Sequence, residues 1–159
     1  MQVARSLYDT LTVPDEDGDY VPYLAKALDH DDSYKEWTIT LRPDITFHDG
    51  STLDAQVVKN NLDAYRGSYE GRSPLLFSFV MANVADVEVV NELTVRVTTD
   101  VPWVAFPAVL YASGRLGIMA QKQLDAPASD CSTKPIGTGP FSFVSWTRDQ
   151  SLKVRRYPK

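Results

Sequence analysis

Residues 36–50, which read EWTITLRPDITFHDG, decide the fold class of this chain. Apolar side chains stand at every second position of the first half, at Trp37, Ile39 and Leu41. A period of two residues is typical of a strand with one buried face. Pro43 interrupts the pattern because proline has no N–H to donate to a neighbouring strand. The alternation resumes after it, and Asp49-Gly50 then predicts a turn.

A helix is predicted directly after this turn, from Asp54 to Arg66. The carboxylate of Asp54 is a suitable N-cap because it accepts from N–H groups that the first helical turn leaves unpaired. Gly67 is suited to end the helix. One apolar stripe follows the helical spacing and is expected to face the core: Ala55, Val58, Leu62 and Tyr65.

The remaining segments predict an α+β fold without a strict alternation of strands and helices. Residues 86–99 predict a hairpin that turns at Asn91-Glu92, and residues 141–157 predict a second hairpin. We expect a mixed sheet built from Trp37–Phe47, Asp86–Thr99 and the C-terminal hairpin, with the helix packed on it. Residues 74–84 are apolar enough for a short buried helix, although periodicity alone does not decide this. Residues 103–111 predict a helix with Pro107 near its start, and residues 119–124 predict one or two helical turns. Residues 125–135 predict a loop.

Composition narrows the class of function. The chain has 159 residues, of which 43% are hydrophobic and 23% charged, and its formal net charge is −5. These values are ordinary for a globular domain, and the negative balance argues against nucleic acid as a partner. No apolar run approaches the roughly 20 residues that cross a bilayer, and no signal peptide is recognised. The single cysteine, Cys131, is an inert thiol or pairs outside the chain.

The glycine motif and the two histidines favour structural roles. Gly137-Thr138-Gly139 is followed by Pro140 and a strand pattern, whereas a dinucleotide fingerprint needs a third glycine and a helix. The motif therefore predicts a tight turn at the entry to a strand. His48 stands at a strand end and is interpreted as a hydrogen-bonded structural residue. No structural zinc site can be formed, because the two histidines are far apart in no ligand-spaced motif and only one cysteine is present. No other metal site and no cofactor are predicted.

Two groups of charged residues leave alternatives open. Asp15, Glu16, Asp17 and Asp19 surround Gly18 without the spacing of a calcium-binding loop, so a solvated turn is expected. Arg115 lies between two glycines, where its guanidinium holds a ligand carboxylate or simply occupies a surface loop. The many carboxylates also leave a carboxylate-based hydrolase as a competing class of function.

The motifs, taken in order, resemble the bacterial oligopeptide-, dipeptide- and nickel-binding proteins, which are extracellular solute-binding proteins of family 5. The matching stretches cover nearly the whole chain: Leu7-Tyr8-Asp9-Thr10-Leu11, Pro22-Tyr23-Leu24-Ala25, residues 37–43, residues 47–55 with Val57-Val58, and residues 135–141 followed by Trp146. Each is modest alone, and their order makes the resemblance specific. It implies part of the first lobe of a periplasmic-binding-protein-like fold, in the class with an extra subdomain.

The resemblance also implies an organisation and a set of site residues. Residues 1–135 would form the lobe segment with the extra subdomain, and residues 136–159 a hairpin that returns to the main sheet of the lobe. Phe77 and Arg115 would face the ligand. Structural roles are expected for Asp49, Gly50, Asp54, Gly137, Gly139 and Pro140.

The implied function is ligand capture rather than catalysis. The protein would be the substrate-binding component of an ABC importer, would bind a peptide, a metal chelate or a similar small ligand, and would deliver it to a permease. It would be extracellular or periplasmic and tethered to the membrane in a longer parent protein, of which this chain is a piece. Such a piece is expected to self-associate through its open hairpin. The alternatives are the hydrolase and a free-standing interaction module.

Overall fold

The computed structural model describes residues 2–70, 78–147 and 149–158. Its central element is a four-stranded sheet in the order β3 (Ala25–His30), β4 (Glu36–Leu41), β6 (Thr94–Thr99) and β5 (Val84–Asn91). Every strand pair in the described ranges is antiparallel. Two small hairpins complete the strands: β1 (Thr12–Pro14) with β2 (Tyr20–Pro22), and β7 (Phe141–Thr147) with β8 (Ser151–Arg156).

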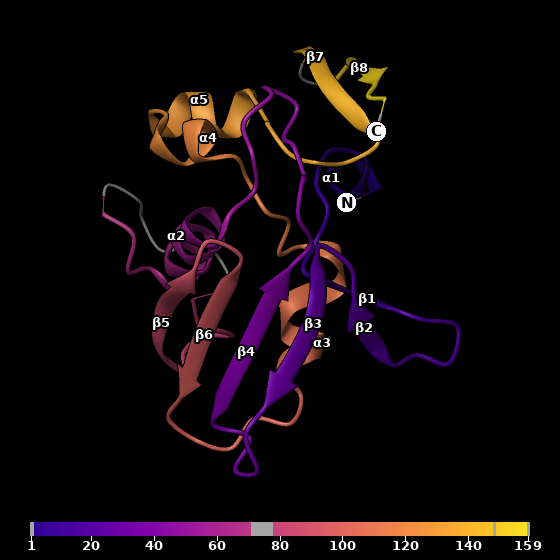
Figure 1. The fold of residues 1–159 in the computed structure, drawn as a ribbon. Coiled ribbons are helices and arrows are strands. Elements are labelled where there is room, and N and C mark those ends of the chain that lie inside the picture. Colours follow the sequence, from indigo (N-terminus) through magenta and orange to yellow (C-terminus); the bar gives the residue numbers. More distant parts are fainter. Residues whose placement is uncertain (1, 71–77, 148, 159) are drawn as a thin grey trace.

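Helices lie behind one face of the sheet and beyond its upper end (Figure 1). The helices are α1 (Gln2–Leu7), α2 (Ala55–Arg66), α3 (Phe106–Tyr111), the short 3₁₀ turn η1 (Ala112–Gly114), α4 (Gln121–Asp125) and α5 (Ala128–Thr133). α2 packs against β5 and β6, and α3 packs against β1 and β2. The α+β class predicted from the sequence is confirmed.

The strand predicted at the start of residues 36–50 forms as β4, and its apolar side faces the hydrophobic core. Trp37, Ile39 and Leu41 of β4 are buried. The strand ends at Leu41, so the segment through Phe47 leaves the sheet, and Thr46 forms only an isolated bridge with Thr52. The predicted Asp49-Gly50 turn is present: Asp49 Oδ1 accepts from the Ser51 N–H at 3.1 Å, and Gly50 has a φ of 85°.

α2 confirms the helix prediction at both ends and along its face. The Val57 N–H donates to Asp54 Oδ1 at 2.8 Å, so Asp54 is the N-cap. Gly67 ends the helix in the left-handed region with a φ of 84°. The predicted stripe is buried at all four positions: Ala55, Val58, Leu62 and Tyr65.

The hairpin at 86–99, the helix with Pro107 near its start and the helical turn after 119 are likewise confirmed as β5–β6, α3 and α4. The predicted loop at 125–135 is wrong, because it contains α5. Its composition favours a loop, but Pro127 is compatible with a helix start and Lys134 pairs with Asp130 one turn away at 2.9 Å. The predicted short helix at 74–84 lies partly outside the described residues. Residues 78–83 are turns, and Val84 already begins β5.

The C-terminal hairpin forms as predicted, but its expected place in the central sheet is wrong. β7 and β8 pair only with each other and lie apart from the four-stranded sheet, beside α1 (Figure 1). Two hydrogen bonds of Tyr157 attach the residue that follows the hairpin to other segments of the chain. The Tyr157 N–H donates to the Pro140 carbonyl at 2.8 Å, and the Tyr157 hydroxyl donates to the Phe47 carbonyl at 3.0 Å.

Candidate functional site

The motif segments, which are far apart in the sequence, meet at one junction above the sheet. The Gly139 N–H donates to the Leu7 carbonyl at 3.0 Å, which joins the glycine turn to the end of α1. The imidazole of His48 bridges the same turn: Nδ1 accepts from the Gly137 N–H at 3.3 Å, and Nε2 lies 2.9 Å from the Gly139 carbonyl oxygen. This confirms the structural interpretation of His48.

A buried pair of side chains reinforces the junction. The Thr138 hydroxyl donates to Asp9 Oδ2 at 3.0 Å, and Asp9 is only 7% exposed. The Asp9 carbonyl accepts from the Ile118 N–H at 3.0 Å, so this short segment also holds the extended residues before α4. Because a buried carboxylate needs hydrogen-bond donors around it, the Thr138 hydroxyl stabilises Asp9 within the junction.

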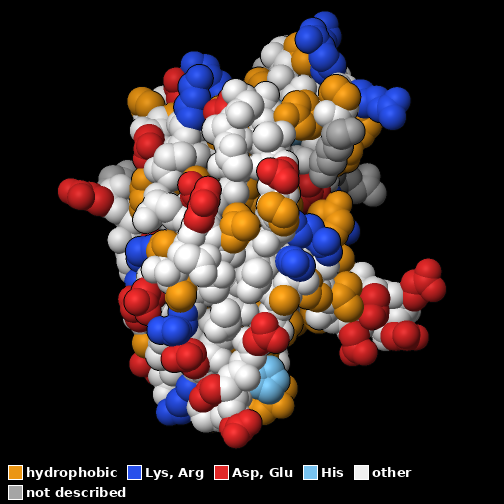
Figure 2. All heavy atoms as spheres, viewed as in Figure 1, with side chains coloured by type: hydrophobic (Ala, Val, Ile, Leu, Met, Phe, Trp, Pro, Cys, Tyr) orange, Lys and Arg blue, Asp and Glu red, His pale blue; other side chains and the backbone are white. Residues whose placement is uncertain are grey.

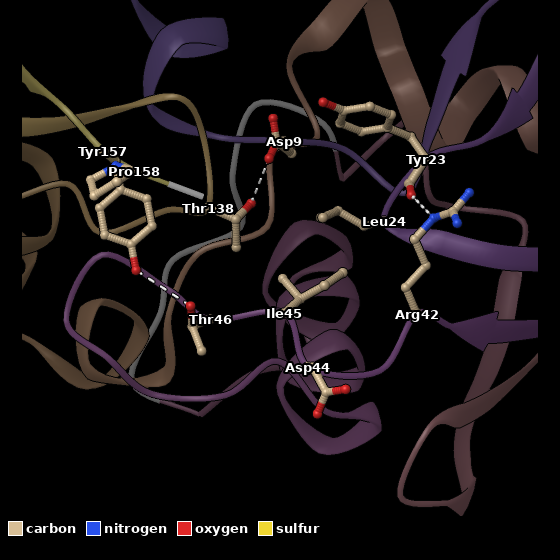
Figure 3. Close-up of a pocket in the computed structure, with 10 residues that line it drawn as sticks. All are labelled: Asp9, Tyr23, Leu24, Arg42, Asp44, Ile45, Thr46, Thr138, Tyr157 and Pro158. Atoms are coloured by element: carbon tan, nitrogen blue, oxygen red, sulfur yellow. Dashed lines mark hydrogen bonds between the residues drawn. The ribbon is translucent and has the colours of Figure 1, made fainter.

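A cavity of about 460 Å³ opens beside the junction, a volume within the range of small-ligand sites (Figure 3). Arg42 stands at one end, where its Nε–H donates to the Tyr23 carbonyl at 2.7 Å, and Tyr157 stands at the other, 3.3 Å from the Thr46 hydroxyl. The cavity is lined by Asp9, Tyr23, Leu24, Arg42, Asp44, Ile45, Thr46, Thr138, Tyr157 and Pro158.

A second, smaller cavity of about 200 Å³ shares Asp9 and Tyr23 with the first. It lies between α1 and the end of α3, and three tyrosines contribute to its walls. Burial raises the pKa of the Tyr8 phenol, and its oxygen accepts a hydrogen bond from Gln123 Nε2 at 2.8 Å. The residues that line the cavity are Arg5, Tyr8, Asp9, Thr10, Val13, Tyr23, Tyr111 and Gly114.

Phe77 and Arg115 are the two residues expected to face a ligand. Phe77 lies outside the described residues. Arg115 follows η1 with an exposed side chain, and its backbone carbonyl lies 3.4 Å from the Tyr65 hydroxyl. Phe79, in the turn before β5, belongs to the same apolar run and is 77% exposed.

The acidic loop 15–19 is a turn, as expected. The Asp17 and Asp19 N–H groups both donate to Asp15 Oδ1, at 3.0 Å and 2.9 Å. Figure 2 shows acidic side chains at the tip of the β1–β2 projection. None of residues 15–19 is among the residues that line the two cavities. In the part of the chain that the structure describes, no cluster of three or more His, Cys, Asp or Glu residues is arranged to hold a metal ion.

Comparison with known proteins decides the family. Residues 19–159 match the bacterial extracellular solute-binding proteins, family 5, in the middle region of the family. The chain belongs to this family. Family 5 proteins bind solutes, and the motif residues of this member make turns, caps and junction bonds. None of the helices in the described ranges combines the length and the apolar character needed to cross a membrane.

Curated relatives and solved structures are similar to this chain over nearly its whole length. The glutathione-binding protein GsiB of Salmonella paratyphi A is 32% identical over 98% of the chain. The solved structure of AgaA from Agrobacterium tumefaciens R10 in complex with agropinic acid is 29% identical over 97% of the chain, with a TM-score of 0.80. NikZ of Campylobacter jejuni, solved in complex with Ni(L-His), is 25% identical over 96%, also with a TM-score of 0.80. The chain spans about 30% of the length of each of these relatives.

Proposed function

We propose that this chain is one wall of the ligand-binding cleft in the substrate-binding component of an ABC importer. The observation that carries the proposal is the junction: the residues of the matched motifs hold α1, the 47–50 turn and the glycine turn together by hydrogen bonds. Such residues build a rigid frame, and affinity in a binding protein comes from enclosing the ligand rather than from a reactive group.

The proposed ligand is a small peptide or a metal chelate, most simply one that carries a carboxylate. The ligands named for the relatives support this class, because glutathione, agropinic acid and histidine all carry a carboxyl group. The complete protein would supply the opposite wall of the cleft. Within this chain, residues 1–135 would form the lobe segment with its extra subdomain. Residues 136–159 would form a hairpin that joins the main sheet of the lobe, whose partner strands the complete protein would supply.

The proposed setting is extracellular or periplasmic. The complete protein would be tethered to the membrane and would hand its ligand to a permease. The competing class, a hydrolase that uses two carboxylates, differs in what happens to a bound molecule.

Calorimetry of the complete protein with glutathione, Ni(L-His) and short peptides tests this proposal. We expect saturable binding of at least one of these ligands, recovered chemically unchanged after incubation. Cleavage of a bound peptide or of glutathione, detected by mass spectrometry, would contradict the binding function and favour the hydrolase.

Arg115 and Phe77 are proposed to face the cleft of the complete protein. Replacing Arg115 with alanine should weaken the binding of an anionic ligand by about 1–3 kcal/mol through the loss of a charge-assisted hydrogen bond. Titration of glutathione into the unaltered protein and the Arg115→Ala variant measures the difference. An unchanged affinity would assign Arg115 to the surface of a loop.

The chain on its own is expected to self-associate through the β7–β8 hairpin. Apolar side chains of the hairpin stand exposed at Phe141, Val144, Trp146 and Val154. Open strand edges and exposed apolar patches recruit further chains. Light scattering over a concentration series should show the apparent mass rising for this chain and constant for the complete protein. A monomer at high concentration would instead support an arrangement in which residues 3–11 cover the hairpin.

A further inference from the structure

Arg5 has a fixed position at the mouth of the smaller cavity. It lies on α1, and its Nη2 donates to the Ser113 carbonyl at 2.9 Å. The guanidinium carbon lies 5.4 Å from the centre of the Tyr111 ring, which is a cation–π distance. Gly114 leaves room for the same side chain, since a Cβ at that position would overlap Arg5 Nε. Two contacts from the 111–114 segment, together with the space left at Gly114, therefore hold one exposed guanidinium in a defined orientation.

The surroundings of this guanidinium suit part of a small organic ligand. The cavity of about 200 Å³ beside it has walls from Tyr8, Tyr23 and Tyr111. Tyr20 packs against Tyr111 with ring centres 5.9 Å apart, which extends the aromatic surface. Aromatic walls with a few fixed polar groups are typical of small-molecule sites.

The charges around Arg5 leave it available to an anion. Among the described residues, no carboxylate lies within ion-pair distance of its guanidinium. Asp9, an acid in the cavity lining, is directed to the Thr138 hydroxyl on the side of the junction. The guanidinium carries five N–H donors, of which one is bound to Ser113. The remaining donors can form the paired hydrogen bonds that a carboxylate accepts from arginine.

We propose that Arg5 is a specificity-determining residue that binds a carboxylate of the ligand at the cavity between α1 and the 111–114 segment. The inference rests on the proposed function and adds to it the residue and the cavity that recognise the ligand carboxylate. The Arg5 guanidinium borders this cavity and lies over the Tyr111 ring.

The test is a cycle on the complete protein with two probes, glutathione and glutathione with both carboxylates methylated to esters. Arg5→Gln removes the charge and keeps a polar side chain of moderate length. We expect it to weaken glutathione binding roughly 10- to 100-fold and to change binding of the diester less than about 3-fold. Arg5→Lys keeps the charge without the planar fork, so its glutathione affinity should be intermediate. Arg155→Gln, the same change at an exposed position on β8, is the matched control.

The outcomes separate the inference from the function on which it rests. Equal glutathione affinity in the unaltered protein and the Arg5→Gln variant would overturn the role of Arg5 and leave the binding function intact. An equal loss for the acid and the diester would also overturn it, because the effect would then be structural. Failure of the unaltered protein to bind glutathione would count against this ligand class and the inference together.

Discussion

Replacing Gly137 with alanine is expected to destabilise the protein by about 3 kcal/mol, at the upper end of the usual cost of overpacking. A Cβ at this position would overlap the Leu7 carbonyl oxygen and lie 2.6 Å from Tyr8 Cδ1 and 2.9 Å from the Leu7 carbonyl carbon. The backbone of Leu7 cannot move aside easily, because its carbonyl is bonded to the Gly139 N–H. Relief of the overlap would therefore open the junction between α1 and the glycine turn.

Urea unfolding of the two proteins measures this effect. Gly18→Asn is the control: Gly18 has a φ of 91°, asparagine tolerates that conformation better than most residues, and a Cβ added there would meet no other atom within 4 Å. The control should change the free energy of unfolding by less than about 1 kcal/mol. If Gly137→Ala proved as stable as the control, the close approach of the glycine turn to Leu7 would be wrong.

Replacing Leu62 with alanine is expected to cost about 2–5 kcal/mol of folding free energy. Leu62 is 1% exposed and belongs to the apolar stripe with which α2 packs on the sheet. The loss combines the transfer of a buried side chain with the cavity left behind. Gln56→Ala on the exposed face of the same helix should stay within about 0.5 kcal/mol, and both are measured by urea unfolding. A near-neutral Leu62→Ala would mean that another face of α2 is buried.

Most of the strands and helices that the sequence predicted correctly were predicted from local patterns. The alternation at Trp37, Ile39 and Leu41 and the capped helix after Asp54 depend on neighbouring residues, so they can be recognised without the fold. β3 was not anticipated, although Leu24-Ala25 stands in one of the recognised motifs. Its burial pattern alternates poorly, and its place at the edge of the sheet is set by pairing with β4. The position of the β7–β8 hairpin likewise depends on tertiary bonds of Tyr157.

The candidate site was predictable only in its fixed parts. The structural role of His48 was predicted from an expected strand end that is wrong, since β4 ends at Leu41, but its hydrogen bonds to the glycine turn confirm the role itself. The order of motifs indicated the family. The bond between Asp9 and Thr138 joins residues 129 positions apart, so no local signal could show it. Nothing in the sequence around Arg5 marks it, because its guanidinium is fixed by Ser113 and Tyr111, which are distant in the sequence and adjacent only in the fold.

The most direct test of the central claim, that this chain is one wall of a cleft, is a calorimetric titration of glutathione into the chain alone and into the complete protein. One wall leaves most of a small ligand in water, so much of the contact that offsets the cost of binding is missing. We predict that the complete protein binds glutathione and that the chain alone binds it at least about 100-fold more weakly. Submicromolar binding by the chain alone would contradict the account, because the whole pocket would then lie within these 159 residues.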